Sequence, residues 1–165
     1  MPKAPFLNAS ELCLLSAVYP TPLGYLHIQY NPEHVFSLKI FSSRLLPSVP
    51  SALTDDAAQQ ILEYLQGRRI TFSFPFQFTG SSFQADVWNR ILRVPYGNTA
   101  SYKDLAFSLG RPSAVRAVAS ACGQNPLWIV VPCHRIIGSD GKLHGYAGGL
   151  ELKQKLLNLE QHTYS

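Results

Sequence analysis

The N-terminal part of the chain alternates short apolar runs with turn residues. Apolar residues dominate 12–18, 25–30 and 35–41, and proline, glycine and asparagine residues separate the three runs. Within 35–41 apolar and polar residues take alternate positions, which gives a strand one packed face and one wetter face. The pattern predicts an antiparallel meander of three strands.

A helix is expected after the loop rich in proline and serine at 47–51. Thr54 is its expected cap, Asp55 and Asp56 lie in its first turn, and Gly67 is its expected stop. Its expected apolar face consists of Ala58, Ile61, Leu62 and Leu65.

Four phenylalanines then recur at every second position from Phe72 to Phe78. Because Pro75 lies among them and cannot donate to a sheet ladder, the stretch is expected to be an extended connector packed against a lobe. An aromatic stripe can also stack on bases, but few basic residues interleave with it, so core packing is the preferred interpretation.

Beyond Gly80 the apolar period changes to that of helices. Ser81 or Ser82 is the expected cap of a helix that ends at Pro95, and Trp88 is expected in its core. The expected apolar face of this helix consists of Phe83, Val87, Ile91 and Val94.

Two short helices joined by a glycine-containing turn come next. The first opens with a capping-box pattern from Ser101 to Asp104 and breaks at Gly110, and the second restarts at Ser113. Such a pair forms a helix-turn-helix unit. On the second helix, the expected buried stripe is Val115, Val118, Ala119 and Cys122, and the expected outer side is Arg116, Ala117, Ser120 and Ala121. This nearly bare outer side suits the close approach of a DNA backbone, and packing against another helix explains it equally well.

Composition excludes several classes of protein. Among 165 residues, the three cysteines Cys13, Cys122 and Cys133 show no Cys-x-x-Cys spacing, so reduced thiols are expected in place of a disulfide framework. No apolar run approaches the roughly 18 residues that span a bilayer, and the N-terminus lacks the order of a signal peptide. The protein is expected in the cytoplasm, or in the nucleus if the cell is eukaryotic. A net charge of +4 permits an anionic partner without requiring one.

Cys133 and His134 lie between the apolar pairs Val130–Val131 and Ile136–Ile137. A thiol reacts as thiolate, and a free cysteine with a pKa of about 8.5 is mostly protonated at neutral pH, so nucleophilic work requires a base or positive charge nearby. His134 and Arg135 are the candidates. A structural cysteine that happens to precede a histidine is the commoner explanation of an isolated pair of this kind.

The last helix, Leu150 to about His162, supplies a partner for His134. Leu152, Leu156 and Glu160 are four residues apart and share one apolar face, and a carboxylate on a buried face needs a partner. A carboxylate that fixes the imidazole while the other ring nitrogen faces the thiol follows the logic of a catalytic triad. The alternative is a frayed helix end at which Glu160 reaches solvent.

Two loops border this motif. Asn125, before Pro126, either caps its turn through the side chain or holds the loop of Cys133, and both roles are compatible. The loop 145–149 has little side-chain bulk and exposes backbone groups, and its closeness in sequence to Cys133 makes it a candidate pocket wall.

Taken together, these residues resemble the O6-alkylguanine-DNA alkyltransferase (methylated-DNA–protein-cysteine methyltransferase) family. The family's motifs occur in its order and spacing. They are Pro132-Cys133-His134-Arg135, Ser101-Tyr102, Arg116-Ala117-Val118, Asn125-Pro126, Tyr146-Ala147-Gly148-Gly149 and Glu160. The resemblance covers about residues 80–162.

The resemblance implies an α+β fold with two domains. The expected N-terminal supporting domain, residues 1–79, is an α/β lobe with a small antiparallel, ribonuclease H-like sheet and the connector. Residues 80–165 are expected to form a mainly helical winged-helix/helix-turn-helix domain that binds DNA and carries the catalytic residues.

The resemblance also implies direct repair of DNA. The helix-turn-helix of a monomer would enter the minor groove of duplex DNA, and the alkylated guanine would flip into the cysteine pocket, at a cost of a few kcal/mol. Arg116 would fill the vacated place in the stack, and Tyr102 would press on the adjacent phosphate and hydrogen-bond the base. The other implied base contacts are Ile136, Tyr146, Ala147 and Gly148, and the other implied DNA contacts are Arg111, Ala117, Ser120 and Arg135.

In the implied chemistry, Glu160 orients His134, which takes the proton of Cys133 through a water molecule while Asn125 supports the site. The thiolate then accepts the alkyl group of O6-alkylguanine, with O4-alkylthymine as a second candidate substrate. Because the thioether is stable, each molecule is expected to react once, and such a displacement needs no cofactor. Some relatives hold zinc in the N-terminal lobe, but Cys13, His27 and His34 do not form a recognisable ligand set, so no metal is expected.

Two other functions compete with repair. A lesion-binding protein of the same fold would recognise the base without reacting, but such relatives replace the cysteine that is present here as Cys133. A cysteine hydrolase that uses Cys133, His134 and Glu160 fits less well, because common thiol hydrolases take cysteine and histidine from separate segments.

Overall fold

The computed structural model describes residues 6–7 and 14–163, and the chain divides into two compact units. The first contains the residues up to Gly80 together with 126–128, and the second contains 81–125 and the residues from Ile129 onward. The chain therefore leaves the second unit for three residues and returns to it just before the Cys133 motif.

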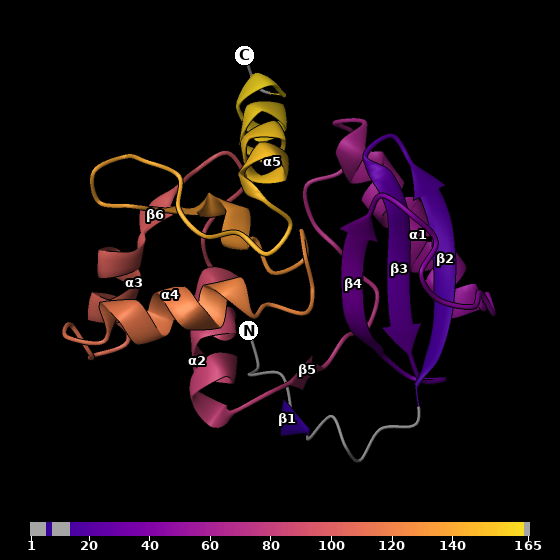
Figure 1. The fold of residues 1–165 in the computed structure, drawn as a ribbon, viewed down its shortest axis with the longest axis horizontal. Helices are drawn as coiled ribbons and strands as arrows, with labels where there is room; N and C mark the ends of the chain where they lie inside the picture. The colour runs from indigo at the N-terminus through magenta and orange to yellow at the C-terminus, as the bar shows by residue number, and fades with distance from the viewer. Residues whose placement is uncertain (1–5, 8–13, 164–165) are drawn as a thin grey trace. The chain divides into compact units, whose positions relative to one another are not determined.

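A three-stranded antiparallel sheet forms the centre of the first unit (Figure 1). Its strands, in spatial order, are β2 (Leu15–Thr21), β3 (Gly24–Tyr30) and β4 (Val35–Phe41). The predicted meander is confirmed, but its first strand continues to Thr21 instead of ending at Val18. Residues 12 and 13, expected in that strand, lie outside the described residues. Pro20 is tolerated because β2 is an edge strand, where a missing N–H donor costs little.

The segment 126–128 extends this sheet beyond β4. Leu38 donates its N–H to Pro126 O at 2.8 Å, and Trp128 donates to Leu38 O at 2.9 Å. The Trp128 ring lies 5.7 Å from that of Phe41, centroid to centroid. The chain is thus anchored to the sheet just before it enters the segment that carries Cys133.

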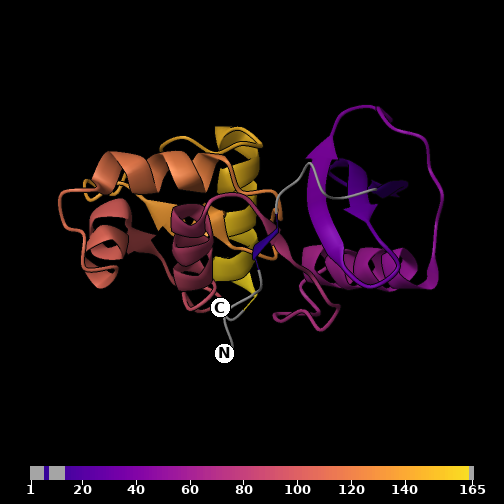
Figure 2. The same ribbon diagram turned by 90° about the horizontal axis from the view of Figure 1, so that it is seen from below.

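Helix α1 (Ala52–Leu65) packs on the sheet, as Figure 2 shows. Its cap is Ser51, and the prediction of Thr54 was wrong by three residues. Thr54 is instead the third helical residue, and its side chain bonds back to the Ser51 N–H in a capping box. Gly67, at φ 73°, ends the helix as predicted. The buried face also differs, because Ala57 and Tyr64 face inward while Leu62 and Leu65 are half-buried.

The phenylalanine stretch is a packed connector, as predicted. Phe74 and Phe78 are buried, and Phe72 and Phe76 are half-buried. Two hydrogen bonds with Val35, one from its N–H and one to its carbonyl, tie the connector to β4. Its last part, β5 (Phe78–Thr79), pairs in parallel with β1 (Phe6–Leu7).

Of the residues considered for a metal site, His27 is used by the core. Its Nε2 accepts from Leu45 N at 3.0 Å, and its ring meets that of Phe41 edge-on. Cys13 lies outside the described residues. Among the residues that the structure describes, no three potential metal ligands cluster together.

The second unit is mainly helical, so the α+β fold class is confirmed. Its elements are α2 (Ser82–Ile91), β6 (Ala100–Ser101), α3 (Tyr102–Ser108), α4 (Val115–Gly123), β7 (Ile136–Ile137) and α5 (Leu150–His162). Helix α4 packs against α2 and α3 (Figure 2). Trp88 lies in the core as predicted and donates its indole N–H to Ala121 O at 2.8 Å. None of the helices in the described ranges has the length and apolar character needed to cross a bilayer.

The structure distinguishes between the two serines that the sequence left as caps of α2. Ser81 is the cap, because its hydroxyl accepts from Gln84 N at 3.1 Å and its N–H donates to Gln84 Oε1 at 2.8 Å.

We expect Ser81→Ala to lower the free energy of unfolding by about 1 kcal/mol. Urea unfolding measures the change. Ser82→Ala, at the next position, is the matched control and should have almost no effect; equal losses would contradict the assigned cap.

Candidate active site around Cys133

Cys133 opens a single 3-10 turn, Cys133–Arg135, that leads into β7. The Cys133 N–H donates to Val131 O at 2.8 Å, and the Asn125 side-chain amide donates to the same carbonyl at 2.9 Å. Asn125 also hydrogen-bonds the Cys133 thiol. Of the two roles that the sequence left open for Asn125, the structure therefore displays the one that holds the cysteine loop.

The backbone before this turn is strained. Ile129 has φ 74°, in the left-handed region that a β-branched residue rarely adopts. Such a conformation costs on the order of 1–3 kcal/mol and persists only where the surroundings hold it. Ile129 follows directly on the segment 126–128, so the strain lies where the chain turns from the sheet-bound segment into the cysteine loop.

His134 and Glu160 meet in the interior. Helix α5 presents Glu160, at 2% exposure, to the fully buried imidazole, and His134 Nε2 donates to Glu160 Oε2. Because a carboxylate only accepts hydrogen bonds, Nε2 carries the proton in the neutral ring, and Nδ1 is the nitrogen with the lone pair. The structure thus brings together the two side chains whose pairing the sequence predicted.

Arg135 points into the protein toward the same carboxylate. Its Nε donates to Glu160 Oε1 at 2.6 Å, and its Nη1 donates to Val94 O at 2.7 Å. Its guanidinium carbon lies 5.5 Å from the centroid of the Tyr96 ring. Arg135, which we expected to contact DNA, is 7% exposed and hydrogen-bonded to the buried carboxylate.

Burial and these contacts set the charges of the site. Burial raises the pKa of the Cys133 thiol well above its ordinary value, and a hydrogen bond with the Cys122 thiol adds to this rise. Burial lowers the pKa of His134, although Glu160 opposes the shift. Burial also disfavours ionised Glu160, but hydrogen bonds and charge from His134 and Arg135 outweigh it and hold its pKa at about 2. Near neutral pH, Cys133 and His134 are therefore uncharged beside an ionised Glu160.

Lys153 is a buried cation that the sequence pattern did not lead us to expect. Its Nζ donates to Ile136 O at 2.5 Å, to His144 O at 2.9 Å and to the Tyr102 hydroxyl at 3.3 Å. Burial lowers its pKa. The spacing of the helix indicates burial of Lys153, because Lys153 and Glu160 are seven residues apart and share a helix face. The sequence analysis instead predicts a buried row of Leu152, Leu156 and Glu160. Leu152 is in fact half-buried.

The 145–149 loop, which is the candidate pocket wall, contains one buried aromatic residue. Tyr146 is 8% exposed, and its pKa is raised by burial and by the nearby groups of Cys133 and Glu160. Ala147 is exposed and Gly148 half-buried on the turn that a hydrogen bond from Gly149 N to Tyr146 O closes.

The outer side of α4 is as bare as predicted, with one exception. Arg116, Ala117 and Ser120 are exposed, whereas Ala121 is buried at 1% because α2 packs there. Arg111, in the turn between α3 and α4, is exposed, and its guanidinium carbon lies 5.4 Å from the centroid of the Phe83 ring.

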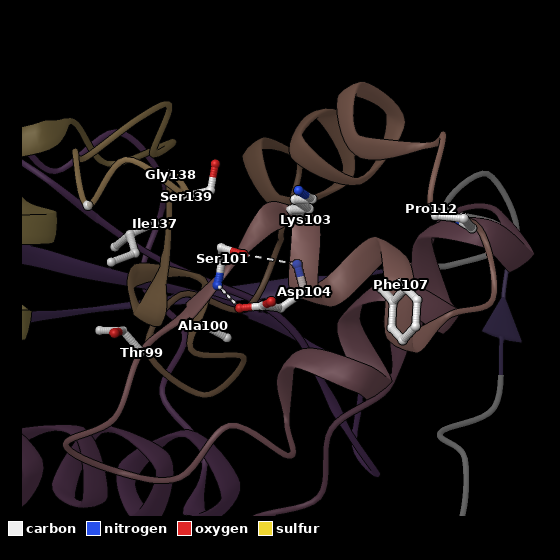
Figure 3. A pocket seen from close by; sticks show the side chains of 11 residues that line it. Thr99, Ala100, Ser101, Lys103, Asp104, Phe107, Pro112, Ile137, Gly138 and Ser139 are labelled. Carbon is white, nitrogen blue, oxygen red and sulfur yellow. Dashed lines mark hydrogen bonds between the residues drawn. The ribbon is translucent and has the colours of Figure 1, made fainter.

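A groove of about 560 Å³ lies beside α3, apart from the thiol (Figure 3). Ser101 and Asp104, which the capping box joins, line it together with residues of the turn at 137–141. Lys103 and the exposed Phe107 line the side formed by the helix. Cys133 does not line this groove.

Comparisons with known proteins agree with this geometry. Residues 82–162 match the family model described as the 6-O-methylguanine DNA methyltransferase, DNA binding domain. A methylated-DNA–protein-cysteine methyltransferase of Methanosarcina barkeri is 36% identical over 152 residues, 88% of this chain and 96% of the relative. The inducible enzyme of that name from Bacillus subtilis is 49% identical over 108 residues, which cover 66% of this chain and 60% of its own length.

The fold agrees as well. The crystal structure of Mycobacterium tuberculosis OGT in complex with DNA is similar to this chain with a TM-score of 0.83 and 36% identity, covering 90% of this chain and 93% of the other. With its buried Cys133-His134-Glu160 cluster and near full-length similarity to such a relative, this chain belongs to the methylated-DNA–protein-cysteine methyltransferase family.

Proposed function

We propose that the protein repairs O6-alkylguanine in duplex DNA by transferring the alkyl group irreversibly to its own Cys133, once per molecule. The observation that carries the proposal is the buried thiol beside the His134–Glu160 pair, in a chain of this family. O4-alkylthymine is a second candidate substrate.

The charges of the site account for the movement of the proton. Cys133 is protonated at rest because its pKa is raised by burial, and His134 is uncharged because burial lowers its own pKa. His134 Nδ1 accepts the thiol proton through a water molecule as the sulfur attacks the alkyl carbon. The carbon–oxygen bond breaks, and the proton is returned to the guanine, which leaves neutral. A neutral thioether remains on Cys133.

The ionised Glu160 stabilises the imidazolium that forms in this step. We assign Arg135 to hold that carboxylate, on the strength of its two hydrogen bonds inside the protein, in place of the DNA contact expected from the sequence. Asn125 is proposed to hold the sulfur in place, since its amide bonds both the cysteine loop and the thiol.

The flipped base is proposed to lie between Tyr102 and the 146–148 turn, with backbone groups of Ile136 and Ala147 reading its edge. Lys153 supports this assignment, because it ties the Tyr102 hydroxyl to the Ile136 carbonyl. Because the buried Lys153 ammonium holds both groups in place, they do not have to become ordered when the base binds. Gly148 is proposed to give the base room through its lack of a side chain.

Helix α4 is proposed to enter the minor groove, where its small exposed residues Ala117 and Ser120 permit close approach. Arg116 would occupy the place of the flipped base. Tyr102 and Arg111 would contact phosphates, and Lys103, on the groove in Figure 3, is positioned on the same helix to add to this charge.

The two parts of the chain have different proposed roles. Residues 80–165 bind DNA and carry the reaction, and residues 1–79 support them. We further propose that the protein acts as a monomer, in the cytoplasm or, in a eukaryotic cell, in the nucleus, since its substrate is the genomic DNA.

The alkyl transfer itself is tested by intact-protein mass after incubation with duplex DNA that contains O6-methylguanine. The wild-type mass should rise by one methyl group, once, and Cys133→Ala should show no increase because the acceptor sulfur is missing. Cys122→Ala is the matched control and should still gain the methyl group. An unchanged wild-type mass despite tight binding of the lesion would favour a protein that only recognises the damage.

The proton relay is tested by the pH dependence of the reaction with O6-benzylguanine. The pKa of His134 is lowered from 6.5, so the wild-type rate should stay level above that pH and fall only at lower pH, where the imidazole becomes protonated. His134→Gln should be slower by about 10²–10⁴ at pH 7 and should gain rate as the pH rises, because only spontaneous thiolate then reacts. His162→Gln, at an exposed histidine of α5, should behave as wild type. A level profile in His134→Gln would exclude the relay.

Base flipping is tested with Arg116→Ala on two substrates. Repair of O6-methylguanine in duplex DNA should fall by tenfold or more, which corresponds to about 1.4 kcal/mol, while the reaction with free O6-benzylguanine should be nearly unchanged. Arg93→Ala removes an equal charge from an exposed site off α4 and serves as the control. Equal losses on both substrates would show that Arg116 acts in another way.

A further inference from the structure

Cys122 is a buried thiol that alkyl transfer to Cys133 does not use. It lies on the inward face of α4 in the last turn, behind the exposed side of that helix, and is 2% exposed. Both Cys122 and Cys133 are free in the structure. No step of the repair reaction requires a second sulfur, so its presence in the site calls for another explanation.

The two thiols belong to one cluster. Asn125 connects the two cysteines: its N–H donates to Cys122 O at 3.3 Å, and its side-chain amide donates at 2.9 Å to Val131 O, which also accepts from the Cys133 N–H at 2.8 Å. The Cys122 thiol also contributes to the raised pKa of Cys133, which agrees with a short distance between the two sulfurs. A disulfide bond is about 2.05 Å long and needs Cα atoms roughly 4.4–6.8 Å apart. Because these contacts bring the two cysteines together, a shift of the cysteine turn would allow the sulfurs to reach that length.

We propose that Cys122 is the resolving partner of Cys133 and that the pair is a site of reversible oxidation by peroxide. The Cys133 thiol gives its proton to His134 and its sulfur attacks one oxygen of hydrogen peroxide. The O–O bond breaks, and the leaving hydroxide takes that proton, so a sulfenic acid and one water result. The Cys122 sulfur then attacks the Cys133 sulfur, the S–O bond breaks, and a second water leaves. In total two thiols lose two electrons and two protons, and one peroxide is reduced to two waters.

The same side chains that prepare Cys133 for alkyl transfer prepare it for this reaction. Lys153 and Asn125 oppose the rise in the pKa of Cys133 that its burial causes, and in the proposed relay His134 takes its proton. A low-molecular-weight oxidant that enters the base pocket therefore meets the same sulfur and the same proton acceptor as the alkylated base. Oxidation beyond sulfenic acid is irreversible for most proteins, and a protein that reacts once loses its whole capacity in that step. A neighbouring thiol that traps the sulfenic acid as a disulfide keeps the acceptor recoverable by a reducing dithiol.

The experiment uses the full chain with Cys13→Ser, so that only the pair remains, and compares it with the same chain carrying Cys122→Ser or Cys122→Ala. Each is treated with an excess of hydrogen peroxide, enough to oxidise an isolated thiol beyond sulfenic acid, and then with dithiothreitol. The parent should become two hydrogen atoms lighter, give a peptide that joins Cys122 to Cys133, and regain its untreated activity toward O6-benzylguanine. Both Cys122 variants should gain oxygen atoms instead and recover at least about fivefold less activity, each relative to its own untreated rate.

Adding Cys133→Ala to the parent should abolish the internal disulfide. A parent chain that gains oxygen, or that forms only disulfide-linked dimers, would overturn the proposal, as would equal recovery in the Cys122 variants. The mass measurement does not depend on repair activity. The proposal rests on the proposed function only where recovered activity is measured. A failure of alkyl transfer would appear separately, as a lack of activity in the untreated samples.

Discussion

The buried carboxylate of Glu160 is the interaction on which the rest of the site depends. An ionised group inside a protein is costly unless every lone pair finds a donor. Glu160 finds three donors, in the His134 ring, the Arg135 guanidinium and the Gly97 N–H, the last at 3.3 Å. Those donors come from the cysteine turn and from the loop after α2, and the carboxylate comes from α5. One charge therefore fixes three segments that are far apart in sequence.

This arrangement explains how the protonated Cys133 thiol, which is a poor nucleophile, can react. Burial keeps the Cys133 thiol protonated and the His134 ring uncharged, so the resting site holds no imidazolium–thiolate pair that would need solvation. The fixed Glu160 charge favours the imidazolium only when the proton moves. The sulfur and the base are both uncharged before and after the reaction, which suits a site that is buried away from solvent.

Much of the local structure followed from short-range patterns. The meander, the capping box at Ser101, the stop at Gly67 and the packed connector all depend on residues within a few positions of one another. The errors arose where two neighbouring patterns were both acceptable. Thr54 and Ser51 belong to one capping box, and only the observed hydrogen bonds show which residue is the cap and which is the third residue of the helix.

The sequence by itself determined which reactive groups occur and in what order: a cysteine followed directly by a histidine, and a carboxylate on the last helix. It also placed a bare helix face upstream, which suits DNA binding and helix packing equally. Tertiary structure alone decided the direction of the long side chains. Arg135 turns inward to a carboxylate 25 residues away, and Lys153 reaches carbonyls on two other segments. Such choices depend on which unpaired charge or carbonyl other segments bring within reach. The periodicity of a helix indicates which of its positions are buried. It does not indicate which partner a long, charged side chain reaches from such a position.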